Sequence, residues 1–302
     1  MTRAGALVTP LASLAALAAL ACTGCGTPPP ASRMPDARSA LTRLHASQDC
    51  GGGIQASAKI DHFGKGGRVR GDLLFFAFWP AKLRMDIVGP MNSGVVATLT
   101  ADEKQFALAD LREKRFLFGP PSSCNIARLT TVPMPGHVLV SILRGQAPVL
   151  KHDASRAATI EWSGSGYYVV KIASTREAEE EIHLAPHPSD FGLPWQQQRM
   201  RVLQIEVRQQ AIVLYHAELS DHRPAAMAKP RVDPDGIDAA LPVSGPVCQA
   251  ELPRTIHVEV PGKEADVLFR YDDVTWNPPV SEGLFTQEAP AGMRPERVTC
   301  DE

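Results

Sequence analysis

Apolar and polar residues alternate through most of this 302-residue chain, and the pattern restricts the fold to one built around a sheet. Ile54, Ala56, Ala58 and Ile60, for example, are separated by polar residues. A period of two places such residues on one face of a strand. Similar segments with short turns between them predict further strands at 68–79, 82–88, 94–100, 105–109, 115–118, 159–162, 167–172, 180–184, 199–207, 211–219, 255–260 and 265–276.

Three short segments have a helical pattern instead. Apolar residues recur at helical spacing in 37–44, in 122–129 and in 138–143. Consecutive strands with tight turns indicate antiparallel pairing, with one face on a core and one face in water. The order of the elements predicts an α+β fold in a single domain, with a large curved antiparallel sheet (a half-barrel) and short helices covering an apolar cavity.

The first residues have the pattern of an export signal. Arg3 precedes an apolar run from Ala4 to Ala21, and the run ends at Cys22. The residues before Cys22 fit a lipobox, after which the cysteine carries lipid, so 1–21 is predicted as a lipoprotein signal peptide. Cys25 is the alternative site of lipidation. An ordinary signal or a short membrane helix is the alternative reading of the segment.

A flexible tether is predicted to follow. Residues 22–35 are rich in Pro, Ser, Thr and Gly, a composition typical of linkers. The mature protein would hang from its acyl chains, with no membrane-spanning helix.

The charge balance and the motifs argue against several functions. The net charge is −2, and acidic and basic residues are interspersed, so nucleic acid is not an expected partner. Residues 163–166 do not fit a nucleophile elbow. His183 and His187 lie four apart on or after a strand, where this spacing does not align two metal ligands. The glutamates of 177–181 are predicted to be a solvated turn and strand start. We therefore expect no enzyme, no cofactor and no metal.

Four cysteines, Cys50, Cys124, Cys248 and Cys300, lie outside the signal region. An even number in an exported protein predicts disulfides. Three pairings are possible, and we predict Cys50–Cys124 with Cys248–Cys300.

A large apolar residue, Met91, occupies the middle of a predicted turn. Gly89, Pro90, Asn92 and Gly94 around it are turn residues. Methionine is flexible and adapts to irregular apolar surfaces, lipid included. Met91 either folds back onto the edge of the core or meets an apolar partner.

The turn at 89–94 and the strands beside it resemble the outer-membrane lipoprotein receptor family LolB, in which a leucine protrudes from a Pro-Leu-Gly turn. Val132-Pro133-Met134-Pro135 and the helix and Arg144-Gly145 after it resemble the Pro-x-Pro segment of that family, and 252–276 resembles its closing hairpin. LolA carriers share the architecture, so the likeness is to the LolA–LolB superfamily over roughly 36–276.

The chain also departs from the family pattern. Met91 stands where the family has leucine, and Asn92 stands where it has glycine. A proline-rich insertion, 221–250, is predicted to hold no regular element, and 277–302 is a C-terminal extension.

The resemblance implies a monomeric lipoprotein on the periplasmic face of the outer membrane, anchored by its N-terminal lipid. It would accept acylated lipoproteins from a periplasmic LolA-like carrier and insert them into the membrane, with Met91 as the membrane-facing tip. The residues expected near the acyl cavity come from the sheet and from a helical lid. They are Phe75, Phe76, Phe78, Trp79, Leu83, Met85 and Ile87 in the sheet, and Leu139, Ile142 and Leu143 in the lid. The alternative is a lipid-binding or scaffold lipoprotein of an envelope assembly that uses the same fold without insertion.

Overall fold

Fifteen strands pair into one sheet in the computed structural model of this protein, which describes residues 26–64, 67–89, 94–153, 158–237 and 239–300. Three α-helices accompany the sheet in these ranges: α2 (Ala37–Gln48), α3 (Ser123–Thr130) and α4 (Gly136–Leu143). The strands are β1 (Gly53–Gly64), β2 (Gly67–Phe78), β3 (Lys82–Val88), β4 (Val95–Ala101), β5 (Phe106–Asp110), β6 (Arg115–Gly119), β7 (Thr159–Ser163), β8 (Tyr167–Ala173), β9 (Ala178–Pro186), β10 (Met200–Gln209), β11 (Ile212–Pro224), β12 (Ala226–Met227), β13 (Glu251–Val260), β14 (Ala265–Trp276) and β15 (Arg294–Arg297). Short 3-10 turns are η2 (Pro188–Asp190), η3 (Trp195–Gln197) and η4 (Pro261–Lys263).

The sheet has the order β15-β6-β5-β4-β3-β2-β1-β14-β13-β11-β10-β9-β8-β7. Apart from the parallel pairs β15–β6 and β12–β14, neighbouring strands are antiparallel. Because β1 pairs with β14, the first and the last long strands meet in the middle of the sheet. The predicted α+β fold, a single domain with a large antiparallel sheet and short helices, is confirmed.

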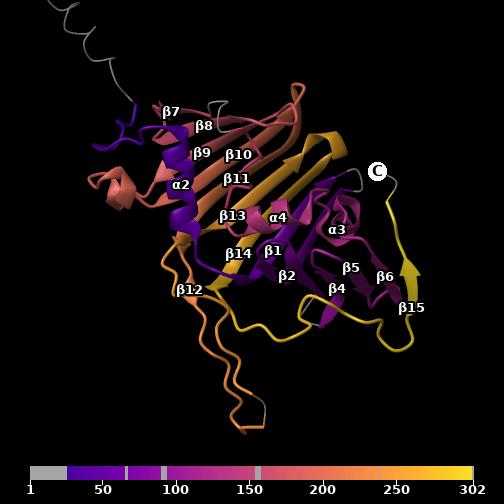
Figure 1. Ribbon diagram of the computed structural model, residues 1–302. Coiled ribbons are helices and arrows are strands. Elements are labelled where there is room, and N and C mark those ends of the chain that lie inside the picture. The colour runs from indigo at the N-terminus through magenta and orange to yellow at the C-terminus, as the bar shows by residue number, and fades with distance from the viewer. Residues whose placement is uncertain (1–25, 65–66, 90–93, 154–157, 238, 301–302) are drawn as a thin grey trace, which may run out of the picture.

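All three helices lie across one face of the sheet, which we call the inner face (Figure 1). The main core fills the space between this face and the helices. Strand β3 shows why the alternation predicted this arrangement, since Leu83 and Met85 are buried between more exposed neighbours. No helix among the described residues is long and apolar enough to cross a membrane.

Helix α4 has sharp boundaries that its sequence explains. Pro135 precedes its first residue, where a missing N–H costs nothing. Gly145 follows its end with a φ of +72°. A Cβ there would lie 2.6 Å from Pro253 Cδ, so glycine is required both for the left-handed conformation and for the close approach of β13.

The segment predicted as a tether is partly folded. Thr27 N donates to Gly164 O at 2.7 Å, and Trp162 Nε1 donates to Thr27 O at 2.9 Å. Met34 is buried, and its N–H donates to Tyr168 Oη. The prediction of a flexible linker is therefore wrong for 26–35, because these residues pack on β7 and β8. The signal peptide, Cys22 and Cys25 lie outside the described residues.

The predicted disulfide pairing is also wrong, although all four cysteines form disulfides. The bonds are Cys50–Cys248 and Cys124–Cys300, between residues 198 and 176 positions apart. Cys50 precedes β1 and Cys248 precedes β13, on either side of β14 in the sheet. Cys300 returns to α3 because β15 runs parallel to β6 and brings the end of the chain beside that helix.

The insertion and the extension are both tied to the sheet. Strand β11 continues to Pro224 by pairing with β13, so regular structure persists in the first part of 221–250, contrary to the prediction. The remainder projects from the sheet as a long arm (Figure 1), with a bridge between Arg231 and Leu241. The extension crosses the outer face, where Phe285 packs on Phe78 with ring centroids 5.4 Å apart. There Ala289 and Met293 cover Ala107, Ala109 and Phe116 of β5 and β6.

Candidate functional site

The structure brings most of the predicted cavity residues together beneath α4. Six of the ten are at most 1% exposed and belong to the main core. They are Phe75, Leu83, Met85, Leu139, Ile142 and Leu143. Ile87 is partly buried and packs against the same core. The inner face and the lid helix therefore meet through apolar side chains alone at these positions.

Phe76, Phe78 and Trp79 lie elsewhere, so their assignment to the inner cavity is wrong. Phe76 and Phe78 alternate with the buried Phe75 and Ala77, which places them toward the outer face. The run 73–79 is apolar on both faces, and on the outer face the C-terminal extension covers Phe78, whereas Leu74 is 46% exposed. Trp79 follows the end of β2 and is 66% exposed.

Two hydrogen bonds hold the C-terminal end of α4. Tyr271 Oη, from the inner face of β14, donates to Leu143 O at 2.8 Å. Arg144 Nη2 donates to the carbonyl of Gly51 at 2.9 Å. Burial raises the pKa of Tyr271 well above its usual value, so its hydroxyl keeps the proton that it donates. These bonds satisfy polar groups at a helix end, where carbonyls lack helical partners.

Helix α3 has a covalent tie that α4 lacks. The Cys124–Cys300 disulfide joins it to the C-terminal extension. Asn125 Nδ2 donates to Pro120 O and Val298 O, at 2.9 and 3.4 Å. Helix α3 is thus fixed to the edge of the sheet.

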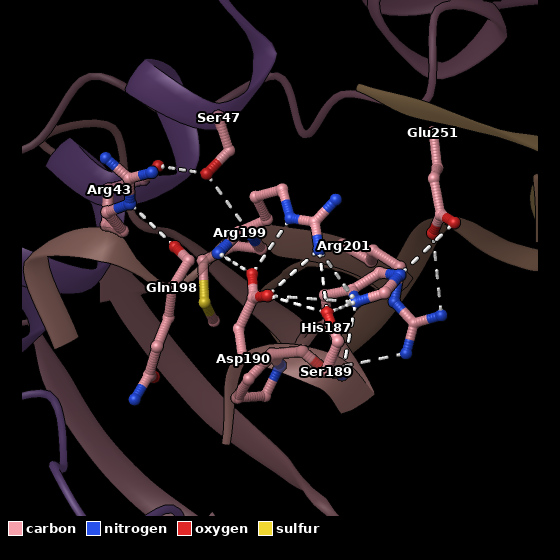
Figure 2. Close-up of polar contacts among 11 residues, drawn as sticks. Arg43, Ser47, His187, Ser189, Asp190, Gln198, Arg199, Arg201 and Glu251 are labelled. Carbon is pink, nitrogen blue, oxygen red and sulfur yellow. Dashed lines mark hydrogen bonds and ion pairs between the residues drawn. The ribbon is translucent and has the colours of Figure 1, made fainter. Parts of the chain in front are cut away.

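Helix α2 is fixed by the polar network in Figure 2. Arg43 Nε donates to Gln198 O at 2.6 Å, and Met200 N donates to Ser47 Oγ at 3.2 Å. Just beyond its end, the Cys50–Cys248 disulfide adds a covalent link. Of the three helices, α4 is the one held to the sheet only by packing and hydrogen bonds.

The buried carboxylate of Asp190 fixes the segment 198–200, to which α2 is hydrogen-bonded. Asp190 is 4% exposed and accepts Arg199 Nε, Nη2 and backbone N, each at 2.9 Å. These bonds hold the pKa of Asp190 well below its usual value. His187 accepts from Ser189 N and lies 3.3 Å from Glu251 Oε1. His183 also has a defined place, since it stacks on Tyr167 and its Nε2 lies 2.8 Å from Glu181 Oε1.

An apolar pocket of about 250 Å³ opens between strands β1–β5 and the end of helix α3. Its apolar wall includes Ile60, Ile87, Ala97 and Leu129. Ile87 is one residue before the end of β3, so the pocket adjoins the β3–β4 turn. That turn is closed by a 2.9 Å bond from Gly89 N to Gly94 O. Met91 itself lies outside the described residues.

One ionisable group inside the core was missed by the sequence analysis. Glu180 is 1% exposed, in contrast to the solvated position predicted for it. Its Oε2 accepts Leu150 N at 2.7 Å, and its Oε1 has no hydrogen-bond partner among the described residues. Burial raises the pKa of Glu180 to about 8. The available signal was the alternation of Ala178, Glu180 and Ile182 along β9, which places all three on the inner face.

One group of side chains has the composition of a metal site. His257 Nε2 lies 2.7 Å from Asp266 Oδ1 and 3.8 Å from Glu259 Oε1. The three are partly exposed, and a ring nitrogen of His257 is within hydrogen-bond distance of Asp266. They alternate with buried residues of β13 and β14, so they lie on the outer face, away from α4.

Several known structures are similar to this chain over most of its length. A LolA superfamily protein from Nitrosomonas europaea is 11% identical, with a TM-score of 0.49 over 83% of this chain and 98% of that chain. A domain from Vibrio parahaemolyticus, named for outer membrane lipoprotein sorting, is 10% identical, with a TM-score of 0.44 over 83% and 95%. A DUF1329 family protein from Desulfovibrio piger is 9% identical, with a TM-score of 0.48 over 83% and 97%.

No family model and no curated protein matches the chain. The structural neighbours are 9% to 11% identical to the chain.

Proposed function

We propose that this protein binds acyl chains between the inner face of the sheet and α4, as a receptor for acylated lipoproteins at the outer membrane. The observation that carries the proposal is the apolar contact between α4 and the sheet. Helix α4, which makes this contact, is held by no disulfide. The open apolar pocket lined by Ile87 lies nearby. No covalent chemistry is needed, because the ligand only exchanges one water-free surface for another.

The energies of opening and filling are comparable. Lifting α4 would expose its buried side chains Val138, Leu139, Val140, Ile142 and Leu143, at about 1.5–3 kcal/mol for each. An acyl chain gains about 0.8 kcal/mol per buried CH₂, so about ten to twenty methylenes offset this exposure. An empty protein would therefore stay closed, and a long-chain ligand would hold it open.

Delivery would take place at the β3–β4 turn. The apolar pocket lined by Ile87 and Leu129 adjoins this turn. Acyl chains would pass from the interior through this pocket to the membrane, which Met91 would contact. Methionine suits such contact because its unbranched side chain adapts to irregular apolar surroundings. We further propose that Cys22, or alternatively Cys25, anchors the protein on the periplasmic face and that a LolA-like carrier supplies the cargo.

The projecting arm supports a second candidate, a lipid-binding scaffold without insertion activity. Val232, Ile237 and Val247 are 68%, 86% and 81% exposed on or beside the arm. Exposed apolar side chains on a projecting segment suit contact with a partner protein.

Transfer of a radiolabelled lipoprotein from its soluble carrier tests the receptor proposal. The protein would begin at Gly26, which keeps all of the described structure, and liposomes would be the final acceptor. We expect Met91→Glu to accept cargo normally but to deliver at least about tenfold less, since a charge in the bilayer costs about 2.5–3.5 kcal/mol. Met91→Leu is the matched control and should deliver like the original protein.

Three outcomes separate the candidates. Failure of the unmodified protein to accept cargo would contradict the receptor proposal. Acceptance without delivery by the unmodified protein would favour the scaffold. Normal delivery by Met91→Glu would contradict only the proposed role of Met91 as the membrane-facing tip.

A further inference from the structure

The largest of the surface pockets described here, about 770 Å³, lies between the C-terminal ends of α2 and α4. It lies above Gly51 and Gly52, which lead into β1, and so at the far end of that strand from the apolar pocket near Ile87. Ser141 and Arg144 in its lining place it at the C-terminal end of α4.

A buried cation lines this pocket. Arg144 is 3% exposed, yet no carboxylate among the residues that the structure describes lies within ion-pair distance of it, and the acidic influence on it comes from Asp49. Nη2 donates to Gly51 O, whereas Nε has no hydrogen-bond partner within the ranges that the structure covers. Burial lowers the pKa of Arg144 to about 10, so the group remains charged at neutral pH. An unmade bond on a buried charged group is costly, and an acceptor-rich ligand would supply it.

Part of the pocket lining is apolar. Trp79 is 66% exposed there, and Ala147, Pro148 and Val149 are half-buried, whereas His45, Asp49, Ser141 and Gln146 add polar groups. Tryptophan combines a large apolar surface with one donor, and it is favoured where one end of a ligand is apolar and the other polar. A cation beside an apolar wall fits an amphiphile at the junction between its chains and its oxygen-rich end.

We infer that the pocket bounded by Trp79 and Arg144 binds the ester-rich polar end of an acyl-glycerol group while the chains pass beneath α4. This inference rests on the proposed function and names the part of the cargo that is recognised. Ester and amide carbonyls of a diacylglyceryl-cysteine are the acceptors that the Arg144 guanidinium requires.

Recognition at this pocket is linked to the lid by the same side chain. Arg144 follows directly on α4, and its bond to Gly51 is one of the two that hold the end of that helix. A ligand carbonyl that accepts from Nε would share this guanidinium with Gly51. The polar end of the cargo and the end of α4 would then be held by one side chain.

Binding of three probes to the protein beginning at Gly26 tests the inference. They are a synthetic diacylglyceryl-cysteine lipopeptide, phosphatidylglycerol with the same chains, and N-phenyl-1-naphthylamine, which is apolar and has no ester. Arg144→Met is expected to weaken lipopeptide binding about tenfold, as expected for loss of one bond to a charged group, and Trp79→Ala by a similar factor through lost apolar contact. Binding of the naphthylamine to Trp79→Ala should change less than about twofold, since the probe needs only the apolar surface beneath α4, and Arg144→Met, which loses the bond to Gly51, should not bind it more weakly. Leu74→Ala, at an exposed apolar residue of the outer face, is the matched control.

The possible results distinguish this inference from the proposed function. No binding of the lipopeptide by the unmodified protein overturns both. Binding that neither variant weakens overturns only the assignment of this pocket. If the two variants bind phosphatidylglycerol and the lipopeptide more weakly by the same factor, recognition of the ester group itself is supported. If they bind only phosphatidylglycerol more weakly, the assignment of the pocket to the lipoprotein cargo is overturned. Trp79 is exposed, so its variant remains informative if Arg144→Met does not fold.

Discussion

The paired substitutions Ala81→Cys and Gly136→Cys are expected to lock α4 onto the sheet and to reduce binding of an acylated lipopeptide by at least about tenfold, because only the open fraction of the protein binds. A Cβ at Gly136 would lie 3.8 Å from Ala81 Cβ, which matches the mean separation in disulfides. The closer neighbour, Ile126 Cδ1 at 3.1 Å, is the end of a flexible side chain. The lock would hold the first residue of α4 against the turn before β3.

The reduced double variant and the two single variants are the controls for this experiment. All three should bind the lipopeptide like the unmodified protein, and that protein must be treated with the same reductant because it has two disulfides of its own. Full binding by the oxidised, crosslinked form would show that the ligand does not need α4 to lift.

Glu180→Gln is expected to stabilise the protein strongly at alkaline pH. The carboxyl group is buried, and burial raises its pKa from 4.5 to about 8. Between these values the unfolded chain loses the proton and the folded chain keeps it, so stability falls as pH rises. One pH unit of difference corresponds to about 1.36 kcal/mol, so the full effect above pH 8 is on the order of 4–5 kcal/mol. Glutamine keeps an acceptor for Leu150 N and removes the titration.

Denaturant unfolding at pH 5 and at pH 8.5 measures this effect. The gain of Glu180→Gln over the original protein should be small at the lower pH and largest at the higher pH. Glu179→Gln, at the exposed neighbouring position, should show no such difference. A gain of equal size at both pH values would contradict a raised pKa for Glu180.

The alternation of the sequence was sufficient to predict the sheet and the lid, since each strand buries one face. Leu83 and Met85 are on the predicted face, and Leu139, Ile142 and Leu143 meet them from α4. The same rule failed in the run 73–79, where both faces are apolar. On the outer face, Phe78 is covered by Phe285 of the C-terminal extension, which no local pattern assigns to β2.

Contacts between distant segments could not be predicted. The cysteine pairs depend on the meeting of β1 with β14 and on the parallel return of β15 beside β6. The packing of 26–35 depends on the surface of β7 and β8. Glu180 lies in a run of glutamates that suggests solvent, although its position along β9 points to the core. In each case, contacts with residues distant in the sequence determined the position, and local composition did not.

Photo-crosslinking with a lipopeptide that carries a diazirine near the end of one acyl chain tests the central claim most directly. The label should attach to β3 and α4, at residues such as Leu83, Met85, Leu139 and Ile142, which line the contact between lid and sheet. Excess unlabelled lipopeptide should abolish this labelling. Attachment only to the arm of 228–250 or to the outer face would contradict the proposal that acyl chains enter beneath α4.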